Sequence, residues 1–349
     1  MHQGRMLLAY LLWLTFPTWA SEPDIEIPAT ARTACDMPFQ RLVEKKIEQG
    51  VPSKHLPRLG FPENGPSDVT VILVHGLFES PYFLRGAGER LRAQGYNTLS
   101  ILLSGQWGKD TVSARDVTFF QWLDELDRAM LIASCLGPRV VFAGHSLGAT
   151  VALAGALKYP DYTAGLLLWA PALKLKLLPT VGGAIGVMTG LSGNVFLGKR
   201  PDLDETPYYS GNQANEARRL AKFIFARHAK NSRTGEEDHS GGAIYEEITA
   251  PTFLVVPMKD PAVQPEAAFS MYDGLSGEKM MIVYPQNSDV WHANVAKSEL
   301  DAYKVSPKDF NKNFDEMMNQ IEGFFNQKID ASGHRNNPLR ELDEPLPVR

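Results

Sequence analysis

The sequence predicts an α/β fold, in which a mostly parallel sheet is flanked by helices and a further segment is inserted between its later strands. Short β-branched and apolar runs alternate with stretches of helical spacing, as they do when crossover connections join parallel strands. One strand leads directly into a glycine-flanked serine and a helix. The strand–helix rhythm lapses once, over residues 171–250, and then resumes. At 349 residues the chain is long enough for one large core.

Residues 1–20 have the features of a secretory signal peptide. Arg5 precedes an apolar run that ends near Pro17, and small residues stand before a cut after Ala20. The run is short for a membrane span. The sequence therefore predicts an exported protein, either periplasmic or secreted. Residues 21–67, rich in proline and charge, are expected to form an arm that leads into the core.

The chain has two cysteines, Cys35 and Cys135, and neither has the spacing of a metal site or a redox motif. An oxidising compartment permits one disulfide between them, and two separate buried thiols are the alternative. A bridge would join the arm to the end of a helix. In the chain-entropy model it would contribute up to about 4 to 5 kcal/mol.

The core is expected over residues 68–170 and 251–330. Its first half is predicted to contain strands at 69–74, 97–103, 139–143 and 164–169, with helices at 81–94, at 118–135 and from Ser146 to about Tyr159. Its second half is predicted to contain strands at 252–256 and 279–284 and a long amphipathic helix at 307–327. Residues 331–349 are expected to form a polar tail.

The segment 171–250 is interpreted as a cap over the active edge of the sheet. It begins apolar and glycine-rich and then turns polar. Its best helical pattern, at 213–230, places Leu220, Phe223 and Ile224 on one side and basic residues elsewhere. That pattern indicates a solvated cap helix and leaves contact with a membrane surface open.

The motif Gly-His-Ser-Leu-Gly at 144–148 stands after an apolar strand and before a helix, where a nucleophile elbow has to stand. This tight turn needs small residues at its flanks and pushes the serine hydroxyl outward. Ser146 is therefore the candidate nucleophile. His145 is interpreted as a flanking residue, because the base has to approach from another loop.

The turn that follows the first core strand is the candidate oxyanion hole. His75 and Gly76 end this strand, and the backbone amides of Leu77 and Leu147 are expected to point at the oxyanion, with Phe78 as the alternative donor. Loss of one such donor typically costs about 3 to 4 kcal/mol of transition-state stabilisation.

A base and an acid are expected on loops after later strands, in the chain order nucleophile, acid, histidine. Asp260 directly follows the strand that begins at Thr252, and His292 follows the strand that ends at Tyr284. His292 is the candidate base for Ser146, and Asp260 the residue that orients it.

Two other carboxylates compete with Asp260 for the role of the acid. Asp289 stands three residues before His292, and Glu266 is a weaker rival. The position of Asp260 directly behind a strand favours it over both. The simplest other role for Asp289 is to cap a helix after His292.

From about residue 68 to 327 the chain resembles a serine hydrolase of the α/β-hydrolase superfamily. It is most similar to the branch of capped monoacylglycerol lipases, carboxylesterases and serine aminopeptidase-like hydrolases. The resemblance rests on Val74-His75-Gly76, on residues 144–148, on the Met-Lys-Asp-Pro-Ala-Val run at 258–263 and on His292. Members of this branch often carry Gly-His-Gly after the second of these strands, where this chain has Ser-Gly-Gln-Trp-Gly at 104–108.

These observations predict a serine hydrolase that cleaves carboxylic esters through an acyl-enzyme, without metal or organic cofactor. The apolar cap favours a small ester with an apolar acyl group. A peptidase or amidase with the same triad and a noncatalytic binding module on the same fold are the alternatives. The oligomeric state is left open.

Other function classes find no support in the sequence. A net charge of −5 provides no field for nucleic acid, and no phosphate-binding glycine motif follows a strand. A dehalogenase would need a carboxylate at position 146, where this chain has Ser146.

Overall fold

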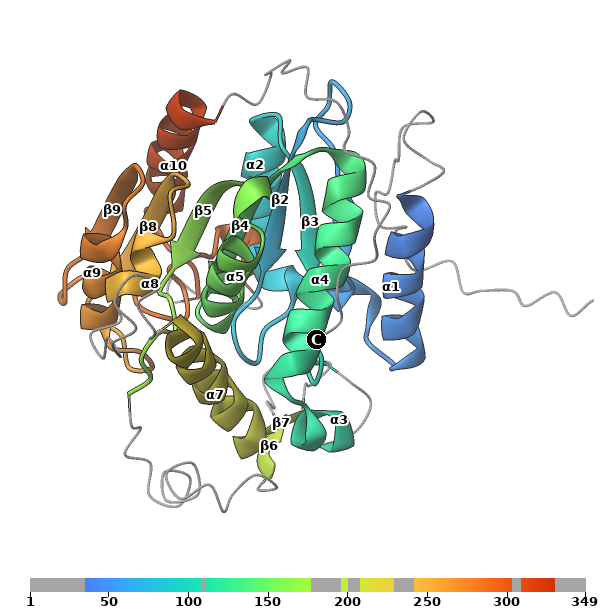
Figure 1. The fold of residues 1–349 in the computed structure, drawn as a ribbon. Coiled ribbons are helices and arrows are strands. Elements are labelled where there is room, and N and C mark those ends of the chain that lie inside the picture. Colours follow the sequence, from blue (N-terminus) through green and yellow to red (C-terminus); the bar gives the residue numbers. More distant parts are fainter. Residues whose placement is uncertain are drawn as a thin grey trace, which may run out of the picture.

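The computed structural model describes residues 35–107, 111–176, 196–199, 208–228, 242–302 and 309–329. Its centre is a seven-stranded sheet of order β1-β3-β2-β4-β5-β8-β9, parallel throughout except for β1 (Figure 1). The strands are β1 (Arg58–Gly60), β2 (Val69–Val74), β3 (Asn97–Ile101), β4 (Arg139–His145), β5 (Thr163–Trp169), β8 (Thr252–Pro257) and β9 (Lys279–Tyr284). The predicted fold class is confirmed.

Helices flank the sheet, and a short hairpin stands apart from it. The α-helices are α1 (Asp36–Glu48), α2 (Arg85–Ala93), α3 (Thr111–Asp116), α4 (Phe119–Leu136), α5 (Leu147–Lys158), α7 (Gly211–His228), α8 (Gly242–Glu246), α9 (Pro265–Gly274) and α10 (Phe314–Lys328). The 3₁₀ turns are η1 (Ser53–His55), η2 (Pro81–Leu84), η3 (Pro160–Tyr162) and η4 (Glu299–Asp301), and the hairpin pairs β6 (Phe196–Lys199) with β7 (Tyr208–Ser210).

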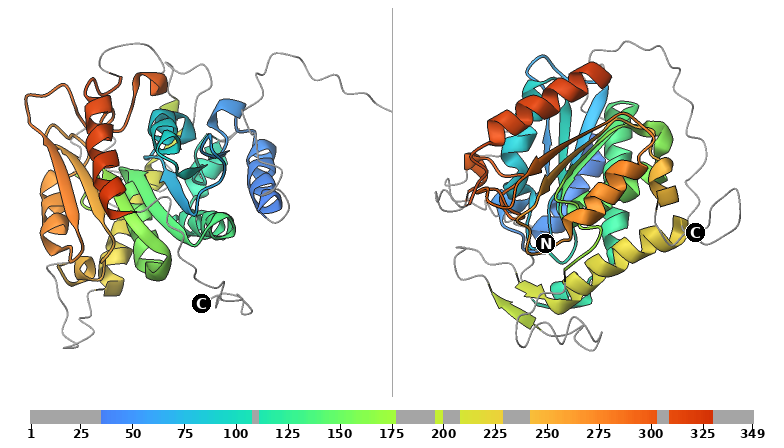
Figure 2. Two further views of the ribbon diagram at one scale, coloured as in Figure 1. Left: turned by 90° about the horizontal axis from the view of Figure 1, so that it is seen from above. Right: turned by 90° about the vertical axis from the view of Figure 1, so that its left-hand side faces the viewer.

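The central strands are buried on both faces, which explains their continuous apolar sequence. All six residues of β2 are buried, and alternate residues enter different clusters: Ile72 packs with α4 and α5, and Leu73 packs with α2 and α10. Figure 2 shows the resulting three layers, with α2 and α10 on one side of the sheet and α4, α5 and α9 on the other. The layers hold the carboxyl ends of the strands in fixed relative positions.

The N-terminal arm is tied to α4 by a covalent bond and by a buried ion pair. Cys35 and Cys135 form a disulfide across a sequence separation of 100 residues, so the alternative of two free thiols is wrong. In the chain-entropy model such a loop contributes about 4.7 kcal/mol. Lys46 of α1 and Glu125 of α4 form an ion pair, and both side chains are 2% exposed. The predicted signal peptide lies outside the described residues, as does the predicted tail at 331–349.

The described part of the cap packs on the core through buried polar contacts. Gln213 of α7 donates from Nε2 to the carbonyl of Gly105 at 2.9 Å, and Glu216 accepts from the amide of Phe119 at 3.0 Å. Leu220 and Ile224 are buried, as the apolar pattern predicted. The proposed limits of the cap remain predictions.

Three local differences from the sequence prediction have physical causes. The short edge strand β1 and the helix α3 were not predicted, because three to six residues carry too little periodicity. The last helix begins at Phe314 and not at residue 307. Asn311 is buried and bonds through Nδ2 to the carbonyl of Val295 at 3.1 Å, while its amide bonds to Lys297. These bonds hold Phe310 in a turn before the helix, although its spacing fits the helical pattern.

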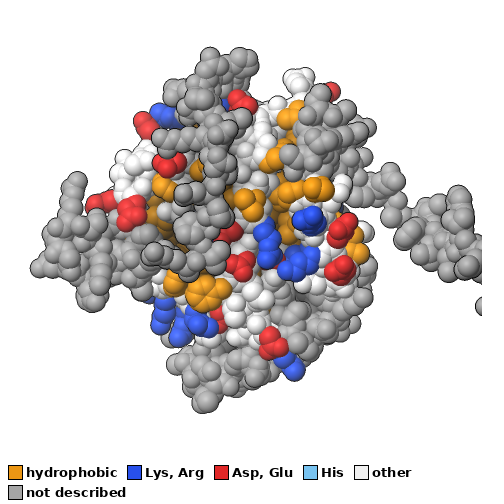
Figure 3. All heavy atoms as spheres, turned by 45° about the vertical axis from the view of Figure 1, so that its right-hand side comes forward, with side chains coloured by type: hydrophobic (Ala, Val, Ile, Leu, Met, Phe, Trp, Pro, Cys, Tyr) orange, Lys and Arg blue, Asp and Glu red, His pale blue; other side chains and the backbone are white. Residues whose placement is uncertain are grey.

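The described residues on one face of the molecule carry charges of both signs (Figure 3). On the face seen in Figure 3, Lys and Arg side chains alternate with Asp and Glu. No helix in the described part of the chain is long and apolar enough to cross a membrane.

Candidate active site

Ser146 lies in a tight turn between β4 and α5, with φ 55° and ψ −116°. The two glycines of the motif make this turn possible. A Cβ atom on Gly144 would lie 2.2 Å from the carbonyl oxygen of Gly148, and one on Gly148 would lie 2.0 Å from that of Val74. Either atom would push strand and helix apart. The turn therefore presents the hydroxyl at the start of a helix.

The structure brings together the three side chains predicted as nucleophile, base and acid. His292 Nε2 lies 2.8 Å from Ser146 Oγ, and His292 Nδ1 lies 2.6 Å from Asp260 Oδ2. The other carboxylate oxygen of Asp260 accepts the amides of Ala262 and Val263, each at 2.8 Å. This cradle fixes the carboxylate, so His292 donates from Nδ1 and presents Nε2 to the hydroxyl as an acceptor.

The rival acids lie elsewhere. The side chain of Asp289 is 78% exposed, and its carboxylate lies 3.3 Å from Lys312 Nζ. The first helical element after His292 in the described part of the chain is η4, and its N-cap is Ser298 and not Asp289, so that prediction is wrong. Glu266 is exposed in the first turn of α9.

Backbone strain is concentrated at this edge of the sheet. The described residues other than glycine with positive φ are Phe78, Trp107, Ser146 and Ala170, and each follows the carboxyl end of β2, β3, β4 or β5. Such conformations cost about 1 to 3 kcal/mol each and persist where the surrounding structure enforces them. Strain of this kind clusters at active sites.

The predicted oxyanion turn lies beside the nucleophile because β2 and β4 are neighbours, with Val74 paired to Gly144. Leu147 is the first residue of α5, so its amide is among those that the helix leaves unpaired. The amide of Phe78, the alternative donor, bonds to Gln106 Oε1 at 3.1 Å. This contact favours Leu77 over Phe78 as the donor from this turn.

His75 holds the ends of β2 and β3 together and takes no part in the triad. Its Nδ1 lies 2.7 Å from the carbonyl of Gly76, and its Nε2 lies 3.1 Å from the amide of Leu103. One ring nitrogen therefore donates and the other accepts, which requires the neutral ring. Burial lowers the pKa of His75 to about 4, in agreement with that state.

A charged cluster that sequence reasoning missed lies directly behind the triad. Glu79 Oε2 accepts from His145 Nδ1 at 2.9 Å and from the amide of Gly76 at 2.9 Å. Glu79 Oε1 lies 2.8 Å from Lys297 Nζ. The second nitrogen of His145, Nε2, lies 2.7 Å from the backbone carbonyl of His292.

These contacts keep Glu79 ionised and hold His145 in place. Burial alone would raise the pKa of Glu79, but Lys297 and His145 outweigh it and hold that pKa well below its ordinary range. Glu79 is therefore a carboxylate, and the carbonyl of His292 is also a pure acceptor. Acceptors therefore face both ring nitrogens of His145, so this side chain ties Glu79 to the main chain of His292. His145, interpreted from sequence as a flanking residue, is a positioning residue.

Replacement of Glu79 by glutamine is expected to lower the free energy of unfolding by about 3 to 5 kcal/mol, because the ammonium of Lys297 loses its buried counter-charge. It should also lower kcat about ten- to a hundredfold through displacement of His292. Urea unfolding and initial rates measure both effects. Adding Lys297→Met should recover part of the stability, and the exposed Glu63→Gln should change neither quantity. An unchanged kcat in Glu79→Gln would remove the positioning role.

The pH dependence of this stabilisation has a definite sign. Because the pKa of Glu79 is lower in the folded than in the unfolded chain, its contribution is complete above pH about 4.3, the ordinary glutamate value. It is lost as the pH falls from there through the folded-state pKa. Urea unfolding at a series of acidic pH values should show that the free energy of unfolding of the wild type falls toward that of Glu79→Gln as the pH is lowered.

Comparisons with known proteins identify the family of this chain. The family model described as serine aminopeptidase, S33, matches residues 65–293. A thermostable monoacylglycerol lipase from Bacillus sp. (strain H-257) is 26% identical over 231 residues, which cover 65% of this chain and 84% of the lipase.

Two solved structures share the fold over 78% of this chain. The monoacylglycerol lipase of Paleococcus ferrophilus has a TM-score of 0.56 at 18% identity, with 98% of its chain covered. A soluble variant of monoglyceride lipase from Saccharomyces cerevisiae, in complex with a substrate analogue, has a TM-score of 0.59 at 14% identity, with 91% covered. At these identities the likeness shows the fold. Since the family model covers more than half of the sequence, this chain belongs to the serine aminopeptidase, S33, family of α/β-hydrolases.

Proposed function

We propose that this protein hydrolyses carboxylic esters through an acyl-enzyme on Ser146. The observation that carries the proposal is the pair of short contacts from His292, 2.8 Å to Ser146 Oγ and 2.6 Å to Asp260 Oδ2. His292 takes the proton from the hydroxyl as it attacks the ester carbonyl and delivers it to the leaving alcohol. Water then attacks the acyl-enzyme with His292 as base, and Ser146 is regenerated.

The tetrahedral intermediates need donors for their oxyanion, and the amides of Leu77 and Leu147 are proposed to supply them. The bond from Phe78 to Gln106 supports this choice, because it fixes the turn that carries Leu77. Asp260, held by the backbone amides of Ala262 and Val263, stabilises the imidazolium that forms on His292.

An apolar acyl group is the proposed substrate feature. The cap sequence has no charged residue from Leu177 to Val195. It follows β5, and the amide of Ala172 bonds to the carbonyl of Ser146 at 3.1 Å, so the chain enters the cap beside the nucleophile. The similarity to a monoacylglycerol lipase supports an ester over an amide.

Export to an oxidising compartment is part of the proposal. The disulfide between Cys35 and Cys135 supports it, because such bonds persist in secreted and periplasmic proteins. The leader-like features of residues 1–20 point the same way.

A panel of substrates with matched acyl groups tests the proposed specificity. We expect p-nitrophenyl esters to be hydrolysed, and kcat/KM to rise by up to about fourfold for each methylene buried, which corresponds to about 0.8 kcal/mol. The p-nitroanilides of the same acids and aminoacyl p-nitroanilides should react far more slowly. Faster turnover of the amides would favour the peptidase alternative. Absence of turnover on the whole panel would favour the noncatalytic binding module.

A further inference from the structure

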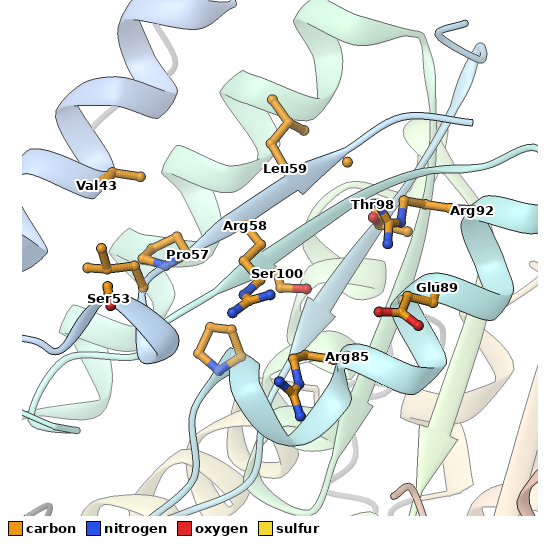
Figure 4. Close-up of a pocket in the computed structure, with 14 residues that line it drawn as sticks. Val43, Ser53, Pro57, Arg58, Leu59, Arg85, Glu89, Arg92, Thr98 and Ser100 are labelled. Carbon is orange, nitrogen blue, oxygen red and sulfur yellow. The ribbon is translucent and has the colours of Figure 1, made fainter. Parts of the chain in front are cut away.

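A pocket lined by arginines lies between the edge strands and α2, away from the catalytic machinery. Its volume is about 170 Å³, whereas one water needs only about 10 to 15 Å³ on the same measure. Figure 4 shows Arg58, Arg85 and Arg92 reaching into it, with Glu89 as the one labelled carboxylate. The pocket therefore has room for a polyatomic ligand and a surplus of positive charge.

The secondary structure brings these side chains together from two sides. On α2, Arg85, Glu89 and Arg92 are spaced four and three residues apart, so they share one face of the helix. In the sheet, Arg58 of β1 pairs with Ser100 of β3.

The edge strands contribute hydroxyl groups as well as an arginine. Gly60 pairs with Thr98, and residues two apart point to the same face, so Arg58, Thr98 and Ser100 face α2 together. Thr98 and Ser100 are only 5% and 8% exposed. A ligand in the pocket would thus meet guanidinium groups and hydroxyls from opposite directions.

Two of the three arginines have no ion-pair partner among the described residues. Arg58 donates to the carbonyl of Lys54 at 3.3 Å, and Arg92 is in no salt bridge. Arg85 stacks 3.7 Å above the ring of Tyr82, and its Nε lies 4.0 Å from Asp301. Burial, and next the charge of Arg85, lower the pKa of Arg58. Glu89, whose charge raises that pKa, offsets only part of the positive charge of the three arginines.

Arg92 can lie against the strand because Gly60 has no side chain. A Cβ atom there would lie 2.6 Å from Arg92 Cδ and 3.1 Å from Thr98 Oγ1. By contrast, Arg90 on the next face of α2 bonds to Glu322 at 2.9 Å and 2.8 Å and to Asp315 at 3.0 Å. The same helix thus pairs one arginine fully and directs others into the pocket.

We propose that this pocket binds a phosphate group, with Arg58 and Arg92 as the principal ligands and Thr98 and Ser100 as hydroxyl donors. Guanidinium forks match phosphate oxygens two at a time, and a tetrahedral anion presents oxygens to donors on all sides. The proposal is independent of the ester-hydrolysis proposal, because none of these residues contacts the triad.

Calorimetric titration with inorganic phosphate, against chloride at equal ionic strength, tests this site in the full-length mature protein. We expect saturable binding by the wild type. Arg58→Gln and Arg92→Gln should each weaken it at least about tenfold, as expected when a charged hydrogen bond is lost. Thr98→Val should weaken it severalfold. Arg128→Gln removes an exposed arginine of α4 and should bind phosphate as the wild type does.

A stability measurement separates a binding role from a structural one. In phosphate-free buffer Arg58→Gln should unfold at the same temperature as the wild type or higher, because the substitution relieves repulsion among three cations. Added phosphate should raise the unfolding temperature of the wild type and not that of the variant. A lowered unfolding temperature of Arg58→Gln without phosphate, or unchanged phosphate affinity in both arginine variants, would overturn the proposal.

Glycerol 3-phosphate and vesicles of phosphatidylcholine with or without phosphatidic acid identify the source of the phosphate group. Arg58-dependent binding of glycerol 3-phosphate alone assigns the site to a soluble phosphomonoester. Arg58-dependent binding to the acidic vesicles assigns it to a lipid headgroup. No binding of inorganic phosphate, glycerol 3-phosphate or acidic vesicles by the wild type would refute the site.

Discussion

Replacement of Ser146 by alanine is expected to lower kcat for p-nitrophenyl esters roughly a million-fold, the scale measured when the nucleophile of another serine hydrolase is removed. The hydroxyl 2.8 Å from His292 Nε2 is the proposed attacking group, and alanine would leave His292 with no hydroxyl to activate. The turn itself should survive, because the amide of Ser146 keeps its 2.9 Å bond to the carbonyl of Trp169.

Two comparisons make the Ser146→Ala result specific. The variant should unfold at nearly the same temperature as the wild type, which excludes loss of activity through loss of the fold. Ser270→Ala removes an exposed hydroxyl on α9 and should leave the rate unchanged. Residual ester hydrolysis by Ser146→Ala at more than a few per cent of the wild-type rate would assign the chemistry to another group.

Replacement of Asp260 by asparagine is expected to lower kcat about ten-thousand-fold, as it does in a measured triad. The amide oxygen of asparagine would keep the bonds from Ala262 and Val263 and turn its NH₂ group toward His292 Nδ1. Two donors would then face each other. His292 would adopt the tautomer with its proton on Nε2, which cannot accept the proton of Ser146.

Asp289→Asn is the matched control for Asp260→Asn. It makes the same chemical change at the carboxylate that competed for the role from sequence. Because the side chain of Asp289 is 78% exposed and faces Lys312, we expect its kcat to stay at the wild-type value. A large loss in Asp289→Asn, with Asp260→Asn fully active, would reverse the assignment.

The sequence predicted the parts of the fold whose signal is local. The strand at 69–74 was predicted to the residue because both of its faces are buried and every residue is apolar or β-branched. The edge strand β1 has no such signal, since three residues paired antiparallel at an edge need only one buried side chain, Leu59. The start of the last helix was misplaced because Asn311 acts through contacts with a distant loop.

For the candidate site too, the sequence predicted only the residues that stand in a recognisable motif or chain order. Motif spacing and chain order were sufficient to nominate Ser146, His292 and Asp260, and their catalytic roles remain predictions. Order alone could not separate Asp260 from Asp289, because both follow strands. The structure adds a cradle of backbone amides around Asp260 that has no sequence signature.

Glu79 was missed because its partners come from other parts of the chain. It stands four residues after His75 in a turn, while its partners are His145 and Lys297. The one signal in the sequence was that this carboxylate stands close to the end of the apolar strand β2, where a buried charge needs a partner. Its importance follows only from burial and from the three donors that converge on its carboxylate, His145, Lys297 and the amide of Gly76.

The most direct test of the proposed chemistry is mass spectrometry of the protein after treatment with a fluorophosphonate, which reacts with a serine hydroxyl activated by a histidine. We predict one adduct per chain, located on Ser146, and none in Ser146→Ala. Labelling should also be greatly slowed in Asp260→Asn. An adduct on another residue, or an unmodified wild-type chain under conditions that label a known serine hydrolase completely, would contradict the assignment of Ser146 as an activated nucleophile.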